Sequence, residues 1–138
     1  MPDKLSLNLV TPDKLLISCS TDEIYASGSE GDMGILPGHA ALFCSLRSGG
    51  FRYTTAGVAE YAAVDGGFME VKDDKVTVLA DSAELGNAID YDAAKILKDE
   101  SEQELAKHKG AEDEAVYIDR YNKAALRFNI AEQCRKKV

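Results

Sequence analysis

Histidines and clustered carboxylates, the side chains that most often carry catalysis or bind metals, are few and scattered in this chain. His39 and His108 lie far apart, and neither has a cysteine or carboxylate nearby at a spacing typical of metal ligands. The acidic clusters at 22–23, 73–74 and 112–114 fit turns and a helix start better than a catalytic pair, because no apolar residues surround them to raise a pKa. GxSxG, P-loop and HExxH motifs are also missing from the sequence. We therefore expect no catalytic residue, no cofactor and no metal site.

The three cysteines are Cys19, Cys44 and Cys134. Their odd number, their wide spacing and the lack of a CxxC motif argue against a disulfide framework and favour a reducing compartment. We expect them to act as small apolar residues that are buried or half-buried.

The densest local pattern is the segment 27–40, which holds four glycines and one proline and therefore predicts turns and close backbone approaches. Glu30, Asp32 and His39 lie in the same segment. One interpretation is a purely structural connection. The other is a rigid loop whose exposed charges orient a partner protein that carries basic or amide groups.

Length, composition and charge limit the number of domains and the kinds of partner. The chain has 138 residues, 45% hydrophobic and 29% charged, which suits a single soluble domain or a domain with a short appendage. A net charge of −8 argues against nucleic acid and anionic membrane surfaces as partners. No apolar run is long enough to span a bilayer, so we expect no direct membrane insertion, and the N-terminus shows no signal-peptide pattern.

The chain changes character near residue 87. Ten of the eleven glycines and all three prolines precede that point, and short runs of alternating apolar and polar residues predict strands. Leu5, Leu7 and Leu9 form one such run, and Leu15 and Ile17 are expected to share a face in the next. We expect residues 1–87 to form an antiparallel β-sandwich or barrel that carries a charge of −7.

Residues 88–138 predict two helices separated at Gly110. Asp90 is the expected N-cap of the first helix, with Asp92 in its first turn. Both helices have thin apolar stripes, so the pair must pack on itself, on the sandwich or on another protein. The expected stripes are Ala93, Ile96, Leu97 and Leu105 in the first helix and Tyr117, Tyr121, Ala124, Phe128 and Ala131 in the second.

Five motifs in order give the chain a family resemblance. The run at 30–40, EGDMGILPGHA, matches the motif E-G-(D/E)-x-G-(I/V)-x-P-G-H-A of the epsilon subunits of F-type ATP synthases, of the bacterial or plastid type. The other four lie at 9–12, 46–50, 65–71 and 76–84. With the helical hairpin that follows, the resemblance covers nearly the whole chain.

The resemblance implies an α+β fold, with an N-terminal antiparallel β-sandwich of about ten strands and a C-terminal antiparallel two-helix hairpin. It implies a non-catalytic subunit of the central stalk that binds the gamma subunit and the c-ring. This subunit couples hydrogen-ion transport to ATP synthesis in the catalytic head. The expected location is the cytoplasmic face of a bacterial inner membrane or, as the alternative, the stromal face of a thylakoid.

The resemblance also assigns residues. Glu30 and Asp32 would face the c-ring, and His39 would lie near gamma, unless its ring only satisfies loop backbone. In many members the helices extend into the alpha/beta catalytic head and inhibit ATP hydrolysis. The candidate contacts with a beta subunit are Arg120, Lys123, Arg127, Arg135, Lys136 and Lys137; the alternative is ordinary solvated charge.

Some members bind ATP through an I-D-x-x-R-A motif at the first helix. Ile89, Asp90 and Ala94 match it, but Ala93 replaces the arginine, so a different basic residue would have to hold the phosphates. An ATP-binding conformational sensor is therefore the alternative function, and a β-sandwich adaptor outside any rotor is a third.

Overall fold

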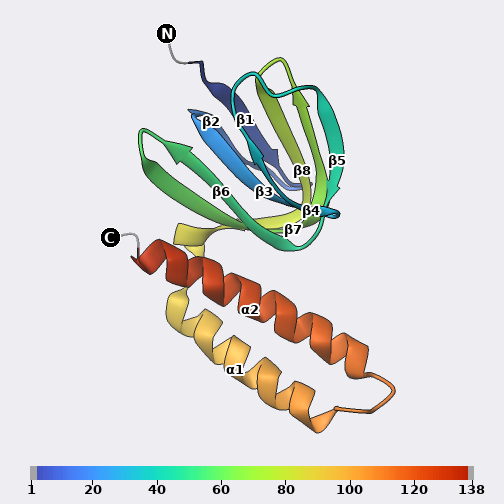
Figure 1. The fold of residues 1–138 in the computed structure, drawn as a ribbon. Helices are drawn as coiled ribbons and strands as arrows, with labels where there is room; N and C mark the ends of the chain where they lie inside the picture. Colours follow the sequence, from blue (N-terminus) through green and yellow to red (C-terminus); the bar gives the residue numbers. More distant parts are fainter. Residues whose placement is uncertain (1–2, 137–138) are drawn as a thin grey trace. The chain divides into compact units, whose positions relative to one another are not determined.

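The computed structural model describes residues 3–136. The chain divides between Leu85 and Gly86 into an all-β unit and a helical unit (Figure 1). Within the described residues, no helix is long and apolar enough to cross a membrane.

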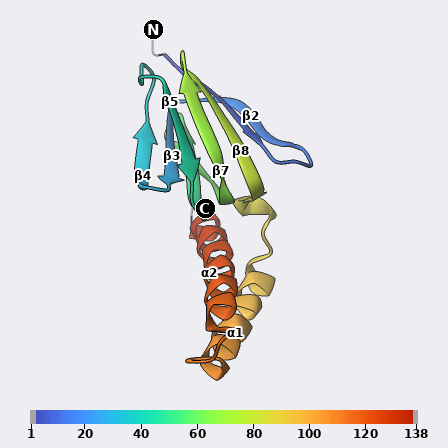
Figure 2. The ribbon, with the colours of Figure 1, turned by 90° about the vertical axis from the view of Figure 1, so that its right-hand side faces the viewer.

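One layer of the β unit consists of β2, β1, β8, β7 and β5, in that spatial order. β1 pairs in parallel with β8, and the other neighbours are antiparallel. Figure 2 shows β5, β7 and β8 side by side in this layer. The strands are β1 (Leu5–Val10), β2 (Leu15–Thr21), β5 (Leu42–Leu46), β7 (Val58–Lys72) and β8 (Lys75–Leu85).

The other layer consists of β4 (Gly31–Ile35), β3 (Glu23–Gly28) and β6 (Gly49–Thr55), continued by the first half of β7 and the end of β8. β7 thus pairs with β6 in this layer and with β5 in the first layer. The expected β-sandwich followed by two helices is confirmed. Residues 3–136 form eight strands rather than about ten, because β7 and β8 each run through both layers without a break.

A close backbone approach lies where β7 and β8 pass from one layer to the other. Gly67 has a φ of 125°, and a Cβ atom on it would lie 2.2 Å from the carbonyl oxygen of Leu79. Only glycine fits this conformation and this contact.

The core between the layers follows the alternation of the sequence. Leu5, Leu7 and Leu9 are all fully buried, because every second side chain of a strand points to the same face. All eight described strands contribute buried side chains to this core, and β6, β7 and β8 supply many of them. Their main contributions are Phe51, Met69, Val71, Val76 and Val78.

The prediction that Leu15 shares a face with Ile17 was wrong. The register of β1 and β2 shifts between Leu9, which pairs with Ile17, and Val10, which pairs with Leu15. This bulge turns Leu15 to the outer face, where it is 56% exposed, while Ile17 remains buried.

The helical unit comprises η1 (Gly86–Ala88), α1 (Tyr91–Lys107) and α2 (Glu114–Lys136). Asp90 is the N-cap of α1, as expected, and its Oδ1 accepts a hydrogen bond from the Ala93 N–H at 3.1 Å.

The expected stripe of α2 is confirmed, but most of the stripe of α1 was wrong. Ala93 is exposed, as are Ile96 (58%) and Leu97 (44%). α1 instead turns Tyr91 and Lys98 toward Phe128 of α2. The spacing of hydrophobic residues did not predict this side of α1, because the contact is formed by an aromatic ring and by the aliphatic stem of a lysine.

Candidate functional site

The acidic residues of the glycine-rich segment lie on the β3–β4 hairpin. Glu30 is at the turn and is exposed, whereas Asp32 pairs across the hairpin with Ser27. The Asp32 carboxylate forms an ion pair of 2.5 Å with Arg47, and both side chains are about half exposed. The hairpin therefore presents the exposed Glu30 carboxylate at its turn and, beside it, the Asp32 carboxylate neutralised by Arg47. Sequence reasoning missed Arg47, although its place next to the turn at 46–50 was visible.

Backbone hydrogen bonds hold this hairpin to the end of β5. The Ser29 N–H donates to the Ser45 carbonyl at 3.0 Å, and the Arg47 N–H donates to the Ser27 carbonyl at 3.1 Å. A Cβ atom on Gly49 would lie 2.4 Å from the Ser27 Oγ, so glycine permits the close packing of β6 on β3. The charges at the tip are thus carried by a well-anchored turn.

His39 lies in the connection between β4 and β5 and is half-buried. Its Nδ1 is 2.7 Å from the Ala40 carbonyl oxygen, which can only accept, so this nitrogen carries the proton. The preceding Gly38 N–H donates to Asp74 Oδ1 at 2.7 Å, which ties the loop to the β7–β8 turn. The expectation that the ring satisfies loop backbone is consistent with this contact, and a role at an interface stays a prediction.

The structure does not bring His39 together with the two carboxylates. Asp32 is near the start of β4, and His39 follows its end, so about 10 Å of strand and the beginning of the next loop lie between them. One continuous sequence motif therefore supplies two separate regions of the surface.

An apolar row crosses the outer face of the layer β2–β1–β8–β7–β5. Leu15 pairs with Val10, Val10 with Leu79, and Leu79 with Phe68, so the four side chains are direct neighbours across four strands. We call these four residues the apolar row. Leu15, Leu79 and Phe68 are 56%, 54% and 49% exposed, although strand residues of this kind are usually covered.

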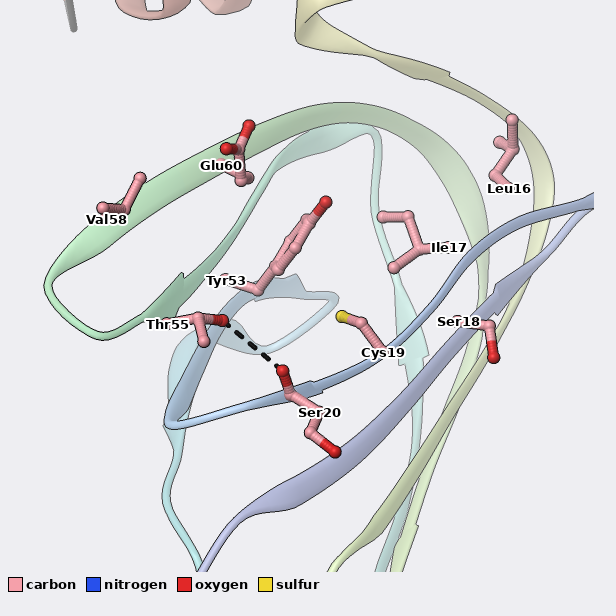
Figure 3. A pocket seen from close by; sticks show the side chains of 9 residues that line it. All are labelled: Leu16, Ile17, Ser18, Cys19, Ser20, Tyr53, Thr55, Val58 and Glu60. Carbon is pink, nitrogen blue, oxygen red and sulfur yellow. Dashed lines mark hydrogen bonds between the residues drawn. The ribbon is translucent and has the colours of Figure 1, made fainter.

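A hollow of about 510 Å³ opens between β2 and the β6–β7 hairpin (Figure 3). Ile17, Cys19 and Tyr53 point into it, and burial raises the pKa of the Cys19 thiol. Of the nine residues that line it, Glu60 is the one of a charged type. The hollow therefore offers no cation to a phosphate group and only a weakly nucleophilic thiol.

Aromatic rings and cations join the two helices. The Tyr91 and Phe128 ring centroids are 5.3 Å apart, with Lys98 Nζ 4.8 Å from the Phe128 centroid and the Arg135 guanidinium 4.3 Å from that of Tyr91. We call these four residues the cation–aromatic cluster. Each contact lies within the range of a cation–π or aromatic pair.

The other candidate basic residues of α2 also have neighbours within the helix or its hairpin. Arg120 lies 5.1 Å from the ring of Tyr117, and Lys123 Nζ is 3.3 Å from Asp119 Oδ2. Arg127 is half-buried. Lys136 pairs with Glu132 at 3.5 Å, and Lys137 lies outside the described residues.

The three residues that match the ATP-binding motif cap or pack the start of α1. Asp90 caps α1, while Ile89 and Ala94 are 7% and 1% exposed. The exposed Ala93 stands where the motif has its arginine. Helix capping and packing account for these three matches without a ligand.

Between residues 3 and 136, no three His, Cys, Asp or Glu residues gather in a group that fits a metal ion. The prominent features are instead an exposed apolar sheet face, an anchored charged hairpin and a thin-striped helix pair. Such surfaces define a protein that works by contact with other proteins, as a component of an assembly.

The comparisons agree with that class. Residues 4–86 match the family model of the ATP synthase delta/epsilon chain, beta-sandwich domain. The chain is 39% identical to the ATP synthase epsilon chain of Geotalea uraniireducens over 99% of its length and 100% of the relative's. It is 45% identical to that of Nitratidesulfovibrio vulgaris strain DP4, over 83% and 86% of the two chains. The chain belongs to the family of ATP synthase epsilon subunits.

A solved structure extends the similarity to the whole fold. A chain of the Euglena gracilis mitochondrial ATP synthase, in an assembly described as OSCP/F1/c-ring in rotational state 1, superposes with a TM-score of 0.73 at 25% identity. The match covers 97% of this chain and 82% of that one.

Proposed function

We propose that the chain is a non-catalytic rotor subunit of the central stalk, which couples ion-driven rotation of the c-ring to the catalytic head through the gamma subunit. Family membership supports this role, as does the similarity to a chain of an F1/c-ring assembly. The observation that carries the proposal is the exposed apolar row, because a sheet face of this kind calls for a protein partner.

The apolar row, together with Phe43 beside it, forms the proposed gamma-binding face. Phe43 is 65% exposed and stacks on Phe68 with ring centroids 5.6 Å apart. Contiguous exposed aromatic and aliphatic side chains are typical of the centre of a protein interface. His39 lies in the loop tied to the β7–β8 turn, which ends the same layer, so it fits the edge of this contact.

The β3–β4 hairpin forms the proposed c-ring contact. Glu30 supplies an exposed charge, and Asp32 with Arg47 supplies both signs on a rigid turn. Polar, wet contacts of this kind set register more than affinity, which suits a joint between rotating parts.

The test of the c-ring contact is ATP-driven proton pumping in inverted membrane vesicles. We expect the double variant Glu30→Lys, Asp32→Lys to lose pumping while ATP hydrolysis continues. The control Asp13→Lys makes the same kind of charge change on the exposed β1–β2 turn and should pump normally. Normal pumping by the double variant would exclude this contact.

The helical unit is the proposed brake on ATP hydrolysis. In an extended state, Arg120, Lys123, Arg127 and Arg135 would meet acidic residues of a beta subunit, after leaving the neighbours they have in the hairpin. The full chain and residues 1–87 should therefore differ when each is added to F1. Inhibition of ATPase activity by the full chain alone supports the brake, and equal activity at low salt removes it.

The proposed location follows from these contacts. A subunit held by gamma and the c-ring is a peripheral membrane protein on the cytoplasmic face of a bacterial inner membrane, with no segment in the bilayer. Fractionation with F1 when the membranes are washed at low ionic strength is the corresponding measurement.

A further inference from the structure

The outer face next to the apolar row is divided by charge. Glu70 of β7 lies between Phe43 of β5 and Thr77 of β8, with which it is paired in register. Two residues farther along the same strands, Lys72 pairs with Lys75. Because side chains alternate along a strand, all five point to this outer face. The face therefore reads apolar, acidic and basic in three successive rows.

A small hollow lies at the border of the first two rows. It has a volume of about 90 Å³ and is lined by Phe43, Phe68, Glu70, Thr77 and Leu79. The stacked rings of Phe43 and Phe68 give it an apolar wall, and Glu70 adds a carboxylate. Within the described residues, Glu70 takes part in no ion pair, so its charge is available to a partner.

We propose that this hollow anchors the gamma subunit by taking one lysine or arginine side chain of gamma. The aliphatic stem of that side chain lies against the Phe43–Phe68 wall, and its cation meets Glu70 and the face of an exposed ring. The volume suits one side chain rather than a small molecule, whose pockets are several times larger. The inference rests on the proposed gamma-binding face and adds the chemistry of its partner.

The three rows also specify the order of side-chain types expected in the bound segment of gamma. Successive rows are about 7 Å apart along a strand, close to the distance of about 6 Å between residues four apart in a helix. A gamma helix that lies along β7 therefore presents an apolar residue, a basic residue four positions on and an acidic residue after four more. Lys72 and Lys75 attract that acidic residue and repel a second cation.

The test is the affinity of the full chain for the gamma subunit, measured by biolayer interferometry at low and physiological salt. Glu70→Gln should weaken binding at least tenfold and reduce its salt dependence, and Glu70→Lys should weaken it further. Glu102→Gln removes the same charge from the exposed side of α1 and should stay within twofold of the unaltered chain. Circular dichroism checks that each variant is folded.

Charge reversal in gamma identifies the residue in the hollow. When the lysines and arginines of gamma are changed to glutamate one at a time, one change should restore tenfold or more of the affinity lost in Glu70→Lys. Unchanged affinity of Glu70→Gln, or no rescue by any reversal, overturns the inference.

A third variant separates this inference from the proposed function. Leu79→Ser removes an apolar residue that belongs to both the apolar row and the wall of the hollow, and it leaves the Glu70 carboxylate in place. If it weakens gamma binding while the Glu70 variants do not, the gamma-binding face stands and the basic anchor is wrong. If Leu79→Ser binds normally, the face itself is wrong, and the anchor falls with it.

Discussion

We expect the helical hairpin to depend on one aromatic residue, Phe128, more than on the rest of its thin apolar stripe. The residue is 8% exposed, and its ring centroid lies 5.3 Å from that of Tyr91 and 4.8 Å from Lys98 Nζ. Phe128→Leu keeps most of the apolar burial but removes both ring contacts. An aromatic pair contributes about 0.5–1.5 kcal/mol beyond its buried area, and an exposed cation–π contact about 0.5–1 kcal/mol.

Together these terms predict that Phe128→Leu lowers the free energy of hairpin opening by about 1–2.5 kcal/mol. Amide hydrogen exchange measures that opening directly, residue by residue. Because 1.4 kcal/mol is a factor of ten, amides of α1 and α2 should exchange about 5- to 60-fold faster in the variant.

A matched substitution separates this effect from a general loss of aromatic character. Phe43→Leu makes the same chemical change at a side chain that is 65% exposed on the β unit, and it should leave helical exchange unaltered. Unchanged exchange in Phe128→Leu would refute the reasoning, because it would mean that the cation–aromatic cluster does not hold the hairpin together.

Three further predictions concern the β unit. Gly67→Ala should destabilise the sandwich by about 2 kcal/mol or more in urea unfolding, because it combines a φ of 125° with a backbone clash; Gly57→Ala, with a φ of 79° and open space around it, should cost only about 1 kcal/mol. The hydrogen bond from Lys4, and then that from the Ala56 N–H, holds the pKa of the Asp22 carboxyl below its usual value. Asp22→Asn should therefore be less stable than the unaltered chain at pH 7, and the difference should shrink below about pH 4 and vanish once the folded carboxyl is protonated; a pH-independent difference would contradict this. Burial raises the pKa of the Cys19 and Cys44 thiols, so alkylation followed by mass spectrometry should show both reacting more slowly at pH 8 than a free cysteine, with rates that rise at higher pH.

Much of the fold could be predicted from local pattern. The alternation of Leu5, Leu7 and Leu9 predicted a buried strand face, and the Asp73–Asp74 pair predicted the tight turn between β7 and β8, where both residues have positive φ. Asp90 predicted the start of α1. These features depend on residues close together in the sequence, so period and turn chemistry were sufficient.

Pairing across strands and helices decided the rest. No local signal shows that a bulge turns Leu15 outward to join Val10, Leu79 and Phe68 in one row. Likewise, Arg47 meets Asp32 only because β5 ends beside the β3–β4 hairpin.

The sequence by itself determined that this chain is an acidic, two-part member of the epsilon-subunit family with a charged, glycine-rich turn. Composition, periodicity and the order of motifs are local or additive properties, so they can be determined without knowing which residues are in contact. The tertiary structure alone decided which exposed apolar residues become neighbours, which carboxylates are neutralised and which side chains close the hairpin. Those properties depend on distances between residues remote in sequence, which register and helix rotation set.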